Sequence, residues 1–235
     1  MAHVVHSYTD LSAAAHACAD RVAHLLRDMI ASRGVAHIAL SGGNTPKAMY
    51  AVLATLPVNW NAVQFWWGDE RCVPQGDKDS NERMATESLL SRLKVPAGNI
   101  HRLPTSLSPA ECAAAYDAEL RRACEIDLKS NQPIIDVLLL GIGPDGHTLS
   151  LFPNSPTLEE ATKAVAPTQA PPTSPVKHRV TLTLPAARAA RYRLFLASGA
   201  DKKSVVRGCL SEPPADQPSA RVGEAEWFLD AAATP

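Results

Sequence analysis

The sequence predicts an α/β fold with three layers, α/β/α, built on a doubly wound and mostly parallel sheet. Short apolar segments of strand length alternate along the chain with longer segments whose apolar residues recur at helical spacing. Glycine-rich turns join several of these strands directly to the next helix. The chain has 235 residues, which suits one large domain, so we expect residues 1–235 to form a single domain.

The composition is that of an ordinary globular protein, with 46% hydrophobic and 20% charged residues. A formal net charge of -1 provides no global attraction to nucleic acid or an anionic membrane, so an anionic ligand needs a local basic cluster. The five cysteines are an odd number without close pairing, which favours a reducing cytoplasm. No apolar run approaches the roughly 20 residues that span a bilayer, and the N-terminus lacks a signal-peptide core. We therefore expect a cytoplasmic protein with no membrane partner.

The elements follow from apolar spacing and from capping residues. The first helix begins after Asp10, a good cap, and ends at Gly34. Residues 159–177 contain four prolines and predict a loop, which we expect to cover the site. The segments that predict strands are 35–40, 63–67, 137–140, 178–184, 192–197 and 227–229. The segments that predict helices are 11–33, 46–56, 81–93, 109–124, a short stretch after Pro185, and one that ends at Leu210.

The strand at 35–40 leads directly into the turn SGGNTP, residues 41–46. Its glycines let the backbone approach a ligand closely. Thr45 is a good N-cap and Pro46 a good first helical residue. A strand, a glycine turn and a capped helix start together predict an anion site, and the P-loop spacing is absent. The candidate anion-binding residues of this turn are Ser41, Gly42, Gly43, Asn44 and Thr45.

Further candidate anion ligands follow two other strands. Arg71 comes directly after the acid pair Asp69 and Glu70, and its planar guanidinium suits a phosphate. These three residues also fit a surface salt cluster. Lys202 and Lys203 stand at the start of a helix, where a cation is unfavourable for the helix dipole unless an anion binds there. An ordinary solvated lysine pair is the alternative.

The chain is organised around residues 136–153, DVLLLGIGPDGHTLSLFP. An apolar strand here opens at its C-terminal end into a glycine turn, and open α/β sheets place ligands at such points. The turn brings Asp145 and His147 together. A histidine titrates near neutral pH and can act as a general base there, which makes this pair the catalytic candidate.

The same turn satisfies the dinucleotide-binding pattern G-x-G-x-x-G with Gly141, Gly143 and Gly146. We reject that interpretation. A proline lies inside the turn, and Pro153 cuts short the helix on which a pyrophosphate would lie. No second strand delivers an acid at the expected offset.

Four stretches together resemble the 6-phosphogluconolactonase family, and the match is colinear over nearly the whole chain. They are SGGNTP at 41–46, DERCVP at 69–74 with Ser80-Asn81, GIGPDGHTLSLFP at 141–153, and RVTLT at 179–183. The resemblance implies a three-layer α/β/α fold shared with glucosamine-6-phosphate deaminases. It also implies hydrolysis of 6-phosphoglucono-δ-lactone to 6-phosphogluconate in the oxidative pentose phosphate pathway, with no metal and no organic cofactor.

The resemblance also implies roles for single residues. His147 is the expected base, and Asp145 is expected to assist it. The substrate phosphate is expected on the turn 41–45, with help from Arg71, Arg179 and Lys202. Because Lys203 is adjacent to Lys202, the choice between the two lysines stays open.

Two other functions fit the same fold. An amino-sugar-phosphate isomerase or deaminase is one, but relatives of that type carry F-N-E-P after the DGH turn, where this chain has Ser150-Leu151-Phe152-Pro153. A sugar-phosphate sensor without catalysis is the other, and sensors of this kind usually carry a helix-turn-helix, for which the chain shows no room. We expect a small-molecule sugar-phosphate lactone as the partner, no nucleic acid, and a monomer or small homo-oligomer.

Overall fold

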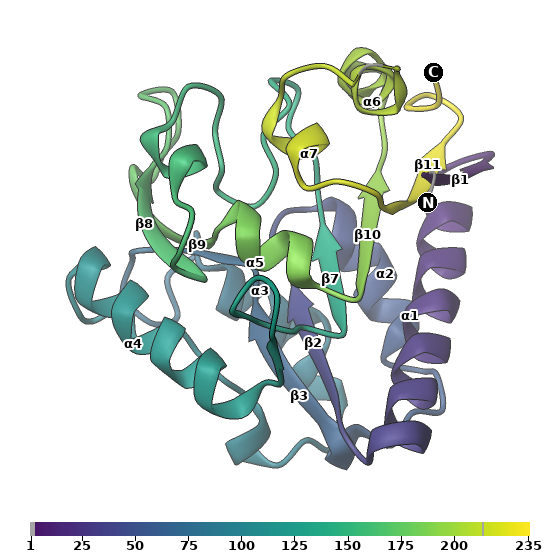
Figure 1. The fold of residues 1–235 in the computed structure, drawn as a ribbon. Helices are drawn as coiled ribbons and strands as arrows, with labels where there is room; N and C mark the ends of the chain where they lie inside the picture. Colours follow the sequence, from purple (N-terminus) through teal and green to yellow (C-terminus); the bar gives the residue numbers. More distant parts are fainter. Residues whose placement is uncertain (1–2, 213) are drawn as a thin grey trace.

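The computed structural model describes residues 3–212 and 214–235, and a six-stranded parallel sheet forms its centre (Figure 1). Every neighbouring pair among these six strands is parallel, as the alternating pattern predicts. In spatial order the strands are β1 (Val4–Tyr8), β11 (Glu226–Asp230), β10 (Tyr192–Ala197), β7 (Val137–Leu140), β2 (Ala36–Leu40) and β3 (Val63–Trp67).

Helices cover both faces of the sheet, which confirms the three-layer prediction (Figure 1). On one face α1 packs against α2 and against the central strands. On the other face α4 reaches β3, where the Tyr116 hydroxyl accepts a hydrogen bond from the Trp67 backbone N–H at 2.8 Å. The helices are α1 (Leu11–Arg33), α2 (Thr45–Leu53), α3 (Asn81–Ser88), α4 (Pro109–Ala123), α5 (Leu184–Ala189), α6 (Lys203–Leu210) and α7 (Pro218–Arg221). Short 3₁₀ turns span Trp60–Ala62, Leu90–Arg92, Ala97–Asn99, Pro156–Glu159 and Ala200–Lys202.

A second, antiparallel sheet was not predicted from the sequence. It consists of β4 (Asp69–Arg71), β9 (His178–Leu182) and β8 (Val165–Gln169), in that order. The prediction of a loop over 159–177 was therefore wrong, since β8 lies within it. Proline is tolerated in β8 because it is an edge strand. A two-stranded hairpin, β5 (Ile126–Asp127) with β6 (Gln132–Pro133), completes the strands of the described chain.

The largest differences from the predicted helix boundaries are at the C-terminal ends of α2 and α3. Helix α2 ends at Leu53 rather than at residue 56, because the residue before Pro57 disfavours the α conformation. Helix α3 is capped by Ser80 as predicted, but it ends at Ser88 and a 3₁₀ turn follows. At α1 the predicted caps are confirmed: the Asp10 side chain accepts from the Ala13 N–H, and Gly34 is left-handed with φ 77°.

The order β10-β7-β2 at the middle of the sheet determines where chemistry can occur. Parallel strands end at the same edge, so the turns after these three strands lie next to one another. These turns are residues 41–44, 141–147 and 198–202. They contain the glycine turn, the acid–histidine turn and the lysine-bearing turn that the sequence pointed out.

Buried polar groups stabilise the opposite end of the sheet, where β2 and β7 begin. His37 in β2 is 4% exposed, and its Nδ1 accepts a hydrogen bond from the Trp66 indole N–H at 3.1 Å. The Asp136 carboxylate accepts from the His37 backbone N–H and pairs with Arg33 at 2.7 Å. Burial lowers the pKa of His37 to about 4, although the Asp136 charge opposes this shift. Arg33 and His101 add smaller lowering effects.

We expect the stability of the protein to fall in mild acid because of His37. Its folded-state pKa lies below its unfolded value, so its contribution is complete above about pH 6.5 and is lost as the pH falls toward the folded pKa of about 4. Over this range the free energy of unfolding should drop by about 3 kcal/mol from this group alone. Urea unfolding at several pH values of wild type and of His37→Asn, which has no titrating ring, measures the difference. Equal pH slopes in the two proteins would contradict the assignment.

Candidate active site

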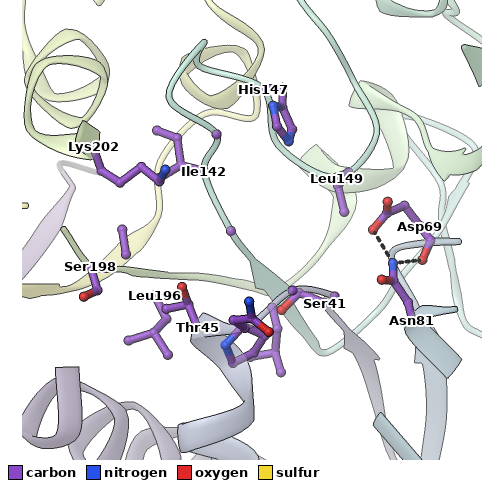
Figure 2. Close-up of a pocket in the computed structure, with 18 of the residues that line it drawn as sticks. Ser41, Thr45, Asp69, Asn81, Ile142, His147, Leu149, Leu196, Ser198 and Lys202 are labelled. Atoms are coloured by element: carbon purple, nitrogen blue, oxygen red, sulfur yellow. Dashed lines mark hydrogen bonds between the residues drawn. The ribbon is translucent and has the colours of Figure 1, made fainter. Parts of the chain in front are cut away.

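A cavity of about 250 Å³ opens over the C-terminal ends of β2, β7 and β10 (Figure 2). The structure brings every predicted site residue except Asp145 to the wall of this cavity. Those that line it are Ser41, Gly42, Gly43, Asn44, Thr45, Arg71, His147, Arg179 and Lys202. Figure 2 shows Lys202 and Asp69 on opposite sides of the cavity, with His147 at its rim between them.

The glycine turn after β2 is held in place by the side chain of Tyr50, and the turn lines the cavity. The Tyr50 hydroxyl accepts from the Ser41 N–H and donates to the Ser41 carbonyl, at 2.9 and 2.8 Å. Gly43 has a left-handed φ of 96°. A Cβ on Gly42 would lie 1.9 Å from the Asn81 side-chain oxygen, so only glycine fits against this amide. Asn81 therefore shapes the turn from the start of α3.

The N-cap of α2 is Asn44, not Thr45 as predicted, and Thr45 is the first helical residue. The Asn44 side chain makes no capping hydrogen bond to the first turn of this helix. The first N–H groups of a helix need partners, and an anion is a suitable one. The missing side-chain cap is consistent with a site for a phosphate.

In the turn after β7, Asp145 and His147 touch. The Asp145 Oδ1 lies 2.6 Å from His147 Nδ1 and also accepts from the His147 backbone N–H at 3.2 Å. The ring N–H at Nδ1 then donates to the carboxylate, which leaves Nε2 as the basic nitrogen. From the sequence alone, Asp145 could either contact His147 or only shape the turn, and the structure shows the contact.

The charge of Asp145 is favoured by its histidine. Burial alone would raise the pKa of Asp145, but hydrogen bonds from the His147 ring and backbone outweigh it, and the pKa is lowered. The ionised carboxylate thus stabilises the turn above the ordinary pKa of an aspartate, and that contribution is lost as the pH falls through the lowered value.

Glycines make this turn possible. The Gly143 N–H donates to the His147 carbonyl at 2.8 Å, and a Cβ on Gly143 would lie 2.1 Å from His147 Nδ1. Gly146 has a left-handed φ of 83°. Of the glycines that matched a dinucleotide pattern, Gly143 is explained by the packing of the acid–histidine pair and Gly146 by its left-handed backbone. No α-helix begins between residues 141 and 155, where a pyrophosphate would need one.

The antiparallel sheet places two arginines side by side, because Arg71 in β4 is paired in register with Arg179 in β9. Arg179 is 8% exposed, and its guanidinium donates to the Ser174 hydroxyl at 2.7 Å. The Nε of Arg71 is buried without a hydrogen-bond partner among the described residues. Burial and then the neighbouring Arg71 charge lower the pKa of Arg179. Two like charges this close favour a bound anion between or beside them.

The two acids before Arg71, Asp69 and Glu70, have different roles. The Glu70 carboxylate accepts from the backbone N–H groups of Arg71, Asn81 and Glu82, so it holds the start of α3. Glu70 does not line the cavity, whereas Asp69 does. The Asp69 carboxylate accepts from the Ser150 hydroxyl at 2.5 Å.

The two adjacent lysines are also distinguished by the structure. Lys202 lines the cavity and forms an ion pair with Asp201, while Lys203 is exposed and does not line it. The turn that carries Lys202 is anchored by Asp230 at the end of β11, whose carboxylate accepts from the Ser198 hydroxyl and the Gly199 N–H.

Several wall residues were missed by the sequence reasoning. Ser198 and residues 141–143 follow predicted strands, so the rule for strand ends could have found them, whereas Asn81 and Leu149 depend on side-chain packing. The additional wall residues are Pro46, Asp69, Asn81, Leu139, Gly141, Ile142, Gly143, Leu149, Leu196, Ala197 and Ser198. None of the residues 159–177 lines the cavity, so the expectation that this segment covers the site was wrong.

Comparison with known proteins identifies the family. The family model described as glucosamine-6-phosphate isomerases/6-phosphogluconolactonase matches residues 9–229. The chain belongs to this family. The chain is 38% identical to the 6-phosphogluconolactonase of Streptomyces coelicolor over 244 residues, which covers 98% of this chain and 92% of the relative. It is 37% identical to the human 6-phosphogluconolactonase over 206 residues, with 83% and 78% covered.

Members of the family share this fold in solved structures. The structure of 6-phosphogluconolactonase from Leishmania guyanensis is 31% identical, with a TM-score of 0.88 and coverage of 99% of this chain and 98% of that one. The corresponding structure from Trypanosoma brucei is 30% identical, with a TM-score of 0.89 and coverage of 98% and 97%. In this chain, no helix within residues 3–212 and 214–235 is long and apolar enough to cross a membrane.

Proposed function

We propose that this protein hydrolyses 6-phospho-D-glucono-1,5-lactone to 6-phosphogluconate, a reaction of the oxidative pentose phosphate pathway. The observation that carries the proposal is His147, which is hydrogen-bonded to Asp145 and lines a cavity whose wall also carries cationic side chains. Family membership and relatives named 6-phosphogluconolactonase support the same reaction.

A lactone is an activated ester, so a water and a base suffice without a covalent nucleophile. His147 Nε2 accepts a proton from the water as its oxygen bonds to C1. The bond between C1 and the ring oxygen then breaks, and the imidazolium returns the proton to that oxygen. Asp145 holds the ring in the required tautomer and stabilises the transient positive charge, because it accepts the Nδ1–H at 2.6 Å.

The phosphate of the substrate provides the orientation. In the proposed mode it binds to the glycine turn 41–45 and the start of α2, with Arg71, Arg179 and Lys202 as cationic partners. Because these groups come from α2 with its preceding turn, from β4, from β9 and from the turn after β10, the phosphate is held in one position relative to His147. Binding energy at the phosphate then places C1 beside the base, which is the advantage of a bound over a free lactone.

The proposed function is tested by a coupled assay on freshly generated 6-phosphogluconolactone, with spontaneous hydrolysis subtracted. We expect rapid formation of 6-phosphogluconate by the wild-type protein. A parallel assay for ammonia released from glucosamine-6-phosphate tests the isomerase or deaminase alternative. Ammonia release without lactone hydrolysis would replace the proposed function with that alternative.

The lysine pair offers a matched test of phosphate binding. Lys202→Met is expected to raise KM by about 10-fold, since a hydrogen bond to a charged group contributes about 1.5–3 kcal/mol and part of this is shared with Asp201. Lys203→Met is the control, because that side chain is exposed and does not line the cavity. Equal KM values for the two variants would remove Lys202 from the phosphate site.

A further inference from the structure

Leu149, two residues after His147, has an unusual backbone conformation. Its φ is 56°, in the left-handed region. The other described non-glycine residues with positive φ are both asparagines, which tolerate this region far better than a leucine does. A leucine with this conformation persists only where its surroundings hold it there, and such strain is concentrated at functional sites.

The turn that contains Leu149 is fastened to both sheets. The Leu151 N–H closes it by donating to the Thr148 carbonyl at 3.0 Å. The Thr148 hydroxyl donates to the Gly141 carbonyl at 2.8 Å, next to the end of β7. On the other side, the Ser150 hydroxyl donates to Asp69 in β4, and its backbone N–H donates to the Thr181 hydroxyl in β9. Fixed at both flanks, the turn has no freedom to relax at Leu149.

The side chain of Leu149 is consequently placed on the cavity wall. It lies between His147 and Asp69 and points into the cavity (Figure 2). A Cβ on Gly68 would lie 2.6 Å from Leu149 Cδ2, so the glycine between β3 and β4 provides the space for this side chain. An apolar surface thus stands beside the proposed base, on the wall between His147 and Asp69.

We propose that Leu149 is a specificity-determining residue, which selects the uncharged lactone ring over the carboxylate-bearing acyclic product; this role rests on the proposed function. The C–H face of a six-membered ring can pack against the leucine when C1 is beside His147. Hydrolysis converts C1 into a carboxylate, and an apolar wall disfavours that charge because it offers no hydrogen bond in place of water. The same side chain therefore supports substrate binding and promotes product release.

The test compares Leu149→Asn with wild type. Asparagine has nearly the same size and accepts the left-handed conformation, so the turn is retained while the wall becomes polar. We expect kcat/KM on the lactone to fall by about 10- to 100-fold, the range for loss of apolar pocket contacts. We also expect 6-phosphogluconate to bind more tightly, as measured by calorimetry and by product inhibition.

Two further variants make the result decisive. Leu149→Gly removes the side chain and relieves the backbone strain, so it should fold at least as stably as wild type and show the same loss of kcat/KM. Leu128→Asn, the same substitution at a leucine that is 96% exposed, is the control and should behave as wild type. Unchanged kcat/KM and unchanged product affinity in both Leu149 variants, with an active wild type, would overturn the role of Leu149 alone. A wild type without lactone turnover would instead overturn the proposed function.

Discussion

Replacing His147 with alanine should lower kcat on 6-phosphogluconolactone by about 10²–10⁴-fold, the usual contribution of a positioned general base. The lactone should still bind, because the phosphate contacts proposed for Arg71, Arg179 and Lys202 are untouched. KM is thus expected to change little. The His147 ring is only partly buried, with 32% of its side chain exposed, so the variant should fold normally. The measurement is the coupled assay, with spontaneous hydrolysis subtracted at each substrate concentration.

Two companion variants sharpen this result. His24→Ala removes a histidine on the exposed face of α1, where it contacts only Asp28 among the ion pairs of the described chain, and should keep full activity. Asp145→Asn keeps the shape of the turn but loses the carboxylate that holds the ring in the required tautomer, so its kcat should also fall while KM changes little. If kcat of His147→Ala equals that of wild type, His147 is not the base.

The second large effect is expected at the arginine pair. Arg71→Met should raise KM by about 10- to 100-fold while kcat changes by less, since a charge-assisted hydrogen bond to a phosphate contributes about 1.5–3 kcal/mol. Arg71 is the member of choice, because Arg179 is buried, donates to Ser174 and lies over the Phe152 ring, so that its loss would also disturb the fold. Steady-state kinetics and calorimetry with 6-phosphogluconate measure the change.

Two further variants serve as controls for the Arg71 prediction. Arg71→Lys retains the positive charge but not the planar fork, so it should restore only part of the affinity. Arg92→Met, at an exposed arginine outside the cavity, should have no effect on KM. A large fall in kcat with an unchanged KM for Arg71→Met would place Arg71 at the reacting carbon instead of the phosphate.

Much of the fold was predictable because local signals agree with the tertiary structure. The central strands are short apolar runs, and Asp10, Ser80 and Gly34 mark helix ends where the structure has them. The turns after β2 and β7 were recognisable as site elements, since glycines and polar residues follow buried strands there. For the same reason, the candidate residues Ser41 to Thr45, His147 and Lys202 were found from the sequence to share one edge of the sheet.

The antiparallel sheet was not predictable by the same means. Strand β4 has three residues, too few to show a period, and β8 carries a proline that in isolation indicates a loop. The pairing of β4 with β9 brings together segments about a hundred residues apart in the chain, and no local pattern encodes such a contact. The resemblance had implied that Arg71 and Arg179 serve one phosphate, but their pairing in register on adjacent strands appeared only with the tertiary structure.

By itself, the sequence determined which turns follow buried parallel strands, and therefore which residues gather at one edge of the sheet. It also placed an acid two residues before a histidine in one of these turns. Only the tertiary structure decided that Asp145 touches His147, that Lys202 and not Lys203 faces the cavity, and that Leu149 is held in a strained conformation on its wall. The physical reason is that periodicity and turn chemistry act over a few residues, whereas the direction of a side chain is set by groups such as Asp69 and Thr181 that distant strands bring to the site.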